Sequence, residues 1–231
     1  MSEVGDSISA KNANWSFDGD IVEKFESHIN KSAQLYELII ECADIFLKKY
    51  SICYELGCSS GSLLHKLSER FKGINSQFIC LDEVEKMIKF ANKKYKNNNL
   101  KFNIANVLYY EYQNADMIIN YYLLQFTRPS FIQNLIDQIY SNLNWGGAFL
   151  CFEKVRSPDA RFQDITTSLY CEYKLKYGYV NDEILDKSRS LKGILELFST
   201  QGNLDIFKRA RFKDITSIFK SICFEGFLCI K

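Results

Sequence analysis

The run Tyr54-Glu55-Leu56-Gly57-Cys58-Ser59-Ser60-Gly61 decides the fold that this sequence predicts. The first three residues of this run complete the apolar stretch 51–56, which has the length of a short strand. A helical pattern of leucines begins directly after Gly61. A glycine at the end of a strand lets the backbone turn sharply and approach a ligand without a Cβ in the way. The spacing is not that of a G-x-G-x-x-G fingerprint, and the Lys-Ser/Thr pair of a P-loop is absent. The run therefore predicts a ligand-binding turn between the first strand and the next helix of an α/β fold.

Strands and helices alternate through most of the chain. Further strands are expected at 77–82, 100–104, 115–121 and 148–153, with helices at 62–71, 85–95 and from 130 to 143. This alternation predicts βαβ units and a mostly parallel sheet. Two final strands, at 214–220 and 226–231, are joined by a short turn and predict a C-terminal antiparallel hairpin, which makes seven strands in all. Gly146 is expected to cap the helix that precedes the fifth strand.

The whole chain, residues 1–231, is expected to form a single domain. Residues 1–14 are polar and aperiodic, which predicts a loose tail, and residues 15–48 predict N-terminal helices that act as a lid. The stretch from about 159 to 198 is rich in tyrosine and lysine and interrupts the alternation, so it predicts a helical insert or cap.

Composition narrows the class of protein. Lys+Arg 29 against Asp+Glu 28 gives a net charge of +1, which argues weakly against a protein whose main partner is a nucleic-acid backbone. No stretch approaches the roughly 20 apolar residues that span a bilayer, and the first residues lack the pattern of a secretory signal. The eight cysteines lie mostly in apolar runs and form no C-x-x-C pair, so no metal site is expected. We expect a cytoplasmic protein without a membrane segment.

Asp82 supplies the second part of a candidate site. It ends the second expected strand, and a carboxylate at this position can accept hydrogen bonds from both hydroxyls of a ribose. An acidic residue two positions before a glycine, followed by a small residue and a second glycine, is typical of the S-adenosyl-L-methionine (SAM) turn of class I methyltransferases. We therefore predict a Rossmann-like class I methyltransferase fold. The alternative is that Gly57 and Gly61 serve only a tight turn and that Asp82 caps a helix.

Nearly the whole chain resembles the carboxy-S-adenosyl-L-methionine (carboxy-SAM) synthases within the class I methyltransferases. The segments that carry the resemblance are Trp15-Ser16-Phe17-Asp18, 25–36, 54–61, Asp82 with Met87-Ile88, Leu124-Gln125-Phe126, 139–148, Glu153-Lys154 and Gly178-Tyr179. Several of these lie outside the motifs shared by all class I methyltransferases.

The resemblance implies a set of site residues. The cofactor contacts it implies are Tyr36, Glu55, Gly57, Cys58, Ser59, Gly61, Asp82, Glu83, Met87, Asn106, Val107, Asn120 and Tyr121. Two candidate catalytic residues are Tyr179 and Arg189. The family has an arginine that pairs with the extra carboxylate of carboxy-SAM, and the gapless match puts Ser188 there, next to Arg189. The family's fourth-strand asparagine falls on Tyr121, and Asn120 lies one residue earlier on the opposite face.

The sequence is compatible with three functions. The first is a SAM-dependent methyltransferase whose small-molecule or tRNA-derived acceptor lies near Tyr170, Tyr173, Tyr177 and Tyr179. The second, which the resemblance implies, is carboxy-SAM synthesis from SAM and prephenate for wobble-uridine modification of tRNA. The third is a non-catalytic SAM- or RNA-associated module, supported by the lysines between 86 and 101. The apolar residues of the insert also favour a homodimer.

Overall fold

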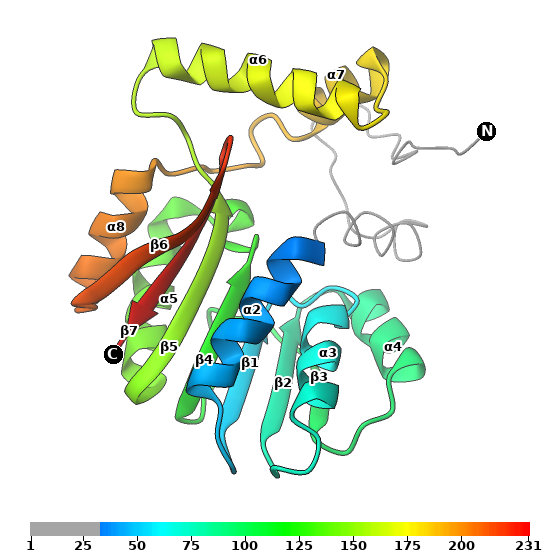
Figure 1. Ribbon diagram of the computed structural model, residues 1–231, viewed down its shortest axis with the longest axis vertical. Coiled ribbons are helices and arrows are strands. Elements are labelled where there is room, and N and C mark those ends of the chain that lie inside the picture. The colour runs from blue at the N-terminus through cyan, green and yellow to red at the C-terminus, as the bar shows by residue number, and fades with distance from the viewer. Residues whose placement is uncertain (1–32) are drawn as a thin grey trace.

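The computed structural model describes residues 33–231 and contains one seven-stranded sheet with strand order β3-β2-β1-β4-β5-β7-β6 (Figure 1). The strands are β1 (Ile52–Leu56), β2 (Gln77–Asp82), β3 (Leu100–Ile104), β4 (Ala115–Tyr121), β5 (Leu143–Lys154), β6 (Asp214–Ser221) and β7 (Phe224–Ile230). The helices are α2 (Ala33–Phe46), α3 (Ser62–Arg70), α4 (Glu85–Lys94), η1 (Leu124–Phe126), α5 (Pro129–Asn142), α6 (Ala160–Lys176), α7 (Asn181–Ser190) and α8 (Thr200–Arg209).

The direction of the strands confirms the expected sheet. Strands β1 to β5 run parallel to one another, and β7 pairs antiparallel with both β5 and β6. The strand order reverses between β1 and β4, because the chain first builds outward to β3 and then returns. In open α/β sheets, ligands bind outside the carboxyl ends of the strands at this reversal.

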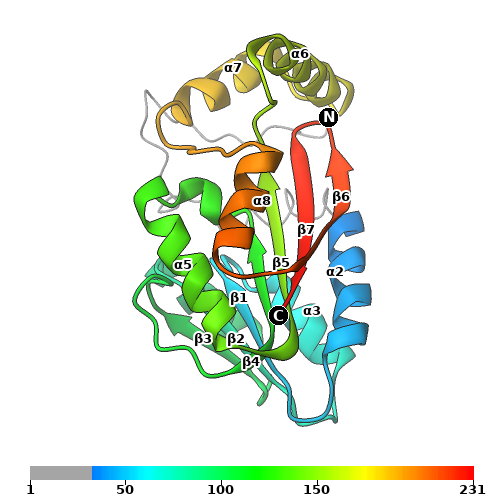
Figure 2. The same ribbon diagram turned by 90° about the vertical axis from the view of Figure 1, so that its left-hand side faces the viewer.

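Helices cover both faces of the sheet (Figure 2). One core holds α2, α3 and α4, with residues such as Ile39, Leu67 and Ile88 packed on the sheet. The other core holds α5 and α8, with Ile136 and Phe207 against the opposite face. Because both faces are buried, the central strands are mostly apolar and do not alternate with polar residues, which explains why they appear in the sequence as short apolar runs.

The junction between α5 and β5 differs from the expectation that Gly146 caps the helix. Helix α5 ends at Asn142, and its C-cap Leu143 already has extended backbone angles, so β5 begins five residues earlier than expected. Gly146 N donates to Lys231 O, and Lys231 N donates to Gly147 O, so the end of the chain pairs with these residues. Gly146 has φ +75° beside a register shift in the β4–β5 pairing. The glycine serves a bulge in the strand, and the pairing partner that makes it a strand is distant in the sequence.

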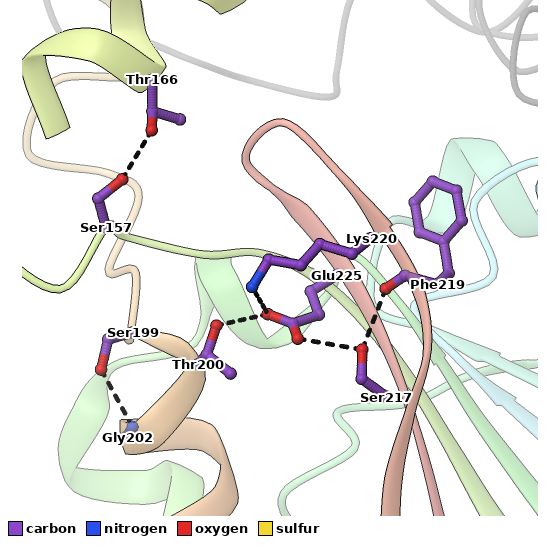
Figure 3. A network of polar contacts seen from close by, with 9 residues as sticks. All are labelled: Ser157, Thr166, Ser199, Thr200, Gly202, Ser217, Phe219, Lys220 and Glu225. Atoms are coloured by element: carbon purple, nitrogen blue, oxygen red, sulfur yellow. Dashed lines mark hydrogen bonds and ion pairs between the residues drawn. The ribbon is translucent and has the colours of Figure 1, made fainter. Parts of the chain in front are cut away.

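Helices α6 and α7 form the expected helical insert and lie beyond the ends of the strands (Figure 1). Two chain segments connect the insert to the sheet, and they are held together by a β-bridge between Arg156 and Ser199. Ser157 Oγ and Thr166 Oγ1 lie 2.9 Å apart and fasten the start of α6 to this junction (Figure 3). The expected tail, and the part of the expected lid before residue 33, lie outside the described residues.

A buried carboxylate, Glu225, holds α8 against the β6–β7 hairpin, next to the bridge between Arg156 and Ser199. Glu225 on β7 accepts hydrogen bonds from Thr200 and Ser217, and it forms an ion pair with Lys220 at 3.4 Å (Figure 3). The three donors balance the cost of removing this carboxylate from water. The network fixes the first turn of α8, and with it the returning segment of the insert.

Candidate functional site

The glycine turn lies between β1 and α3, at the carboxyl end of β1. Gly57 N and Cys58 N both donate to Leu81 O, at 2.8 and 3.1 Å, and Gly61 N donates to Cys58 O at 2.8 Å. Both glycines have positive φ, +66° at Gly57 and +71° at Gly61. A Cβ at Gly61 would lie 2.2 Å from Phe102 Cε1, so both the backbone angle and the space require glycine.

Glu55 lies beneath the turn and faces the start of α3. Its Oε2 accepts a hydrogen bond from Leu64 N at 3.3 Å, so it satisfies one of the free N–H groups of the helix. Burial raises the pKa of Glu55 to about 8, the Leu64 hydrogen bond opposes this shift, and the nearby Asp82 charge adds to it. A cation bound beside Glu55 would favour its ionised form.

Asp82 ties the end of β2 to the glycine turn. Its Oδ2 accepts from Ser59 N and its Oδ1 from Val84 N, each at 2.8 Å. Burial raises the pKa of Asp82, and these two backbone donors lower it. Each carboxylate oxygen keeps a second lone pair, so two neighbouring hydroxyls of a ribose can still be bound.

Two polar side chains follow β2 and β3 at the same edge. Asn106 Nδ2 donates to Glu83 Oε2 at 3.1 Å, and Asn106 Oδ1 accepts from Leu108 N at 2.9 Å. The second lone pair of the Asn106 amide oxygen is the kind of acceptor that an adenine amino group requires.

Aromatic rings surround the space beside the turn. The Tyr36 hydroxyl lies 3.2 Å from Ser62 Oγ, and the Tyr36 ring meets Tyr121 edge-on at a centroid distance of 5.5 Å. Burial raises the pKa of both Tyr36 and Tyr122, so both phenols are neutral. Tyr122 has φ +63°, an uncommon backbone angle for a tyrosine, and it turns the chain directly after β4.

One cavity of about 1240 Å³ brings most of these residues together. It is lined by the expected site residues Tyr36, Glu55, Gly57, Cys58, Ser59, Asp82, Glu83, Met87, Asn106, Val107, Tyr121 and Tyr179, and also by Tyr170, Tyr173 and Tyr177. The expected residues that do not line it are Gly61, Asn120 and Arg189. The cavity extends from the carboxyl ends of β1 and β2 to the undersides of α6 and α7.

Asn120 lies behind the cavity wall. Its Nδ2 donates to Glu153 Oε1 at 2.6 Å, and the same carboxylate accepts from Leu124 N and Gln125 N. Burial raises the pKa of Glu153 to about 8, and the three donors oppose the shift. Asn120 and Tyr121 point to opposite faces, as expected for neighbours on a strand, and only Tyr121 borders the cavity.

The two neighbours on α7 are also separated. Ser188 lines the cavity, whereas the Arg189 guanidinium lies 3.7 Å from Asp186 and both of these side chains are exposed. Arg189 lies about 100° further around the helix than Ser188, and in this structure that step carries its side chain out of the cavity.

The lining residues that were not expected from the sequence include three lysines: Lys154, Lys174 and Lys187. They come from β5, α6 and α7, and no spacing in the sequence connects them. Only Lys154, through the Glu153-Lys154 pair, belonged to a recognised segment.

Residues 33–231 lack the features of a membrane-spanning helix and of a metal site. That part of the chain has no helix long and apolar enough to cross a membrane. It also has no cluster of three or more His, Cys, Asp or Glu side chains suited to a metal ion.

Comparisons with known proteins now place the chain in a family. Residues 54–147 match a methyltransferase domain family. The carboxy-SAM synthase of Campylobacter jejuni is 34% identical over 222 residues, which cover 93% of each chain. The chain belongs to the carboxy-SAM synthase family. The enzyme of the same name from Staphylococcus epidermidis is 29% identical and covers 94% of this chain and 97% of its own.

Solved structures support the fold. Human N-acetylserotonin methyltransferase, solved in complex with SAM, matches with a TM-score of 0.56 at 15% identity over 86% of this chain and 55% of that one. The SAM-dependent methyltransferase SibL gives a TM-score of 0.63 at 14% identity over 90% and 58% of the two chains. The class I methyltransferase fold is therefore confirmed.

As a member of this family, the protein is a SAM-dependent transferase of the methyltransferase superfamily, with SAM or carboxy-SAM as its cofactor. The alternative of a non-catalytic binding module is not retained. The roles of the individual lining residues stay predictions.

Proposed function

We propose that the protein is a carboxy-SAM synthase that acts on SAM and prephenate inside the cavity. The observation that carries the proposal is the single continuous cavity, which joins the turn and Asp82 at one end to α6 and α7 at the other. Its volume of about 1240 Å³ exceeds the range of roughly 300–1000 Å³ that is usual for one small ligand. It has room for a cofactor and a second substrate side by side.

In this proposal, different site residues bind different parts of SAM. Asp82 binds the ribose, Asn106 binds the adenine, and Glu55 lies toward the amino-acid end of SAM. Tyr36 and Tyr121 present ring edges and faces that exclude water around the sulfonium, and the faces of neutral aromatic rings attract cations. In this reaction SAM receives the carboxyl group: its methyl carbon, made acidic by the sulfonium, loses a proton and bonds to the carboxyl carbon that leaves prephenate. The rest of prephenate departs as phenylpyruvate and hydroxide, and the hydroxide takes up the proton as water. Alignment of the two substrates in a dry site favours this transfer.

The test is direct. The purified chain is incubated with SAM and prephenate, and the cofactor is analysed by mass spectrometry for a carboxylated product. SAM binding is measured separately by calorimetry, with Asp82→Asn as the variant that should bind SAM more weakly. A protein that binds SAM and yields no carboxylated product would contradict synthesis.

Methyl transfer to a small-molecule or tRNA-derived acceptor is the second candidate. It is favoured by Ser188, which borders the cavity where the family has its arginine, while Arg189 faces Asp186 outside. Methyl transfer converts SAM into S-adenosylhomocysteine together with a methylated acceptor. The same mass spectrum therefore separates the two reactions.

We also propose a homodimer formed through α6. The outward side chains Phe162, Ile165 and Leu169 are 53%, 47% and 55% exposed, and they lie at helical spacing on one face. Light scattering after gel filtration tests this: the wild type should elute as a dimer, and Leu169→Glu should give a monomer. A wild type that is monomeric at micromolar concentration would refute it.

The proposal extends to the biological setting. A cytoplasmic carboxy-SAM synthase would supply its product for wobble-uridine modification of tRNA. The proposed single domain would use residues 15–48 as a lid and residues 159–198 as a cap over the cavity. The role in tRNA modification is tested by the level of modified wobble uridine in bulk tRNA from cells that lack the protein. The lid and the cap are tested by limited proteolysis with and without SAM.

A further inference from the structure

The short helix η1 lies between two parts of the cavity wall. Leu123, which precedes it, lies directly on the glycine turn, since a Cβ at Gly57 would be 2.8 Å from Leu123 Cδ1. On its other side, Gln125 O accepts a hydrogen bond from Glu196 N at 2.9 Å. Glu196 belongs to the returning segment, residues 191–199, which connects α7 to α8. Helix η1 therefore contacts both the cofactor turn and the end of the helical insert.

One buried carboxylate holds the start of η1. The first N–H groups of a helix have no partner inside the helix. In η1 these belong to Leu124 and Gln125, because the hydrogen bonds within the helix begin with Phe126 N, which donates to Leu123 O at 2.9 Å. Glu153 accepts both of them, from Leu124 N at 3.0 Å and from Gln125 N at 3.1 Å. Leu123, at the N-cap position, has no polar side chain that could do this instead.

The same carboxylate also fixes the end of β4. Glu153 Oε1 accepts from Asn120 Nδ2 at 2.6 Å, and the next residue, Tyr121, borders the cavity beside Tyr36. Glu153 is only 3% exposed, and its own side chain does not line the cavity. It can therefore influence bound molecules only through the chain segments that it holds.

These hydrogen bonds serve geometry more than stability. Burial raises the pKa of Glu153, so its ionised form is held at a cost, and all three of its donors are uncharged. A serine or aspartate at position 123 would satisfy an N–H group of η1 locally, without burying a distant carboxylate. A buried charge without a charged partner adds little net stability, because desolvation offsets its hydrogen bonds. The directional contacts do fix how three chain segments lie relative to one another.

We propose that Glu153 is a positioning residue for the transfer reaction. By holding η1 and the end of β4, it sets the position of the cofactor turn relative to the returning segment, on which Leu191 and Leu195 line the cavity. The inference rests on the proposed function for the presence of two substrates in one cavity, and it deepens that function by naming a residue that aligns them. A misplacement of about 1 Å can lower a rate about a hundredfold, so this link affects turnover more than binding.

The first measurement separates turnover from binding. Glu153→Gln keeps the size of the side chain but has one acceptor oxygen instead of two, so at least one of the three donors loses its partner. We expect kcat for the carboxylated product, counted per SAM-binding site, to fall by about tenfold or more. The KM for prephenate and the Kd for SAM should stay within about threefold of wild type. A residue that only stabilised the fold would reduce the number of binding sites and leave kcat per site unchanged.

Asp116→Asn is the matched control. Asp116 lies near the opposite end of β4 and likewise accepts from a backbone N–H and an amide, those of Ile52 and Asn144, each at 2.9 Å. This substitution should lower the free energy of unfolding and leave kcat per site unchanged. An equal loss of kcat in Asp116→Asn and Glu153→Gln would overturn the positioning role.

A double-mutant cycle tests the route through η1. Leu123→Ala removes the side chain that lies on Gly57. If Glu153 acts through this contact, Glu153→Gln should lower kcat less in the Leu123→Ala background than in the wild type, because both substitutions disturb the same link.

Hydrogen exchange followed by mass spectrometry gives a readout that does not depend on turnover. In the full-length wild type, S-adenosylhomocysteine should slow exchange at the glycine turn, in residues 122–128 and in the returning segment. In Glu153→Gln it should still slow exchange at the turn, whereas the effect on the returning segment should be lost.

Kinetics and exchange separate the positioning role from synthesis. An unchanged kcat per site in Glu153→Gln, or additive effects with Leu123→Ala, would overturn the positioning role. Equal protection of the returning segment in wild type and Glu153→Gln would overturn it as well. A wild type that yields no carboxylated product would refute synthesis, and the exchange pattern would still decide whether Glu153 links the turn to the insert.

Discussion

Gly61→Ala should destabilise the protein through a steric clash, and the cost of this clash can be measured separately from the cost of backbone strain. The Cβ would lie 2.2 Å from Phe102 Cε1 and 2.9 Å from Cζ. Carbon atoms at ordinary contact are about 3.5–4.0 Å apart, so the ring has to move by more than an ångström. Phe102 lies on the edge strand β3 and stacks on Tyr95 at 6.3 Å, so its movement disturbs that packing.

The expected magnitude has two parts. A non-glycine residue in the left-handed region costs roughly 1–2 kcal/mol. Overpacking of a well-packed site costs roughly 1–3 kcal/mol more. Gly61→Ala should therefore lower the free energy of unfolding by about 2–5 kcal/mol.

Gly146→Ala is the matched control. Gly146 has φ +75°, close to the +71° of Gly61, and a Cβ there would meet nothing within 4 Å. It should cost only the strain of about 1–2 kcal/mol. Urea unfolding followed by circular dichroism gives both values, with equal m-values as the check on two-state behaviour.

A double-mutant cycle makes the reasoning falsifiable. In a Phe102→Leu background the smaller side chain relieves the clash, so Gly61→Ala should cost less there by about 1–3 kcal/mol. Equal costs for Gly61→Ala and Gly146→Ala, or no coupling with Phe102, would refute the steric account.

Three further predictions concern charged groups. Asp82→Asn places an amide donor against the Ser59 or Val84 N–H and removes an acceptor for the ribose. SAM binding measured by calorimetry should therefore weaken by roughly 10–100-fold. An unchanged affinity would exclude a ribose contact. Because the pKa of Glu55 is raised to about 8, the group is mostly protonated at pH 6.5, and binding of cationic SAM should release a proton. Calorimetry in buffers of different ionisation enthalpy should detect this release in wild type and not in Glu55→Gln, and SAM affinity should rise with pH up to about 8. Glu225→Ala should reduce the free energy of unfolding by about 2–4 kcal/mol, because Thr200 and its other partners lose a buried acceptor, whereas Lys220→Ala should cost under about 1 kcal/mol.

Local patterns in the sequence were enough to determine the order and type of most elements. Short apolar runs between helical patterns predict a parallel sheet because both faces are buried, and the glycine run 54–61 predicts the turn because only glycine accepts its backbone angles without strain. Asp82 was found for the same reason: the end of a strand adjoining that turn places a carboxylate at one edge of the sheet.

Other features depended on contacts between distant segments. The residues 143–147 became strand because the chain terminus at Lys231 pairs with them, and a helix-stop pattern cannot report a partner some 85 residues away. The choice between Ser188 and Arg189 depended on which side of α7 faces the cavity, and that is set by the packing of the insert. Lys154 and Lys174 come from β5 and α6, and only the folded chain brings both ammonium groups beside the Tyr170 ring, because no spacing in the sequence connects the two elements.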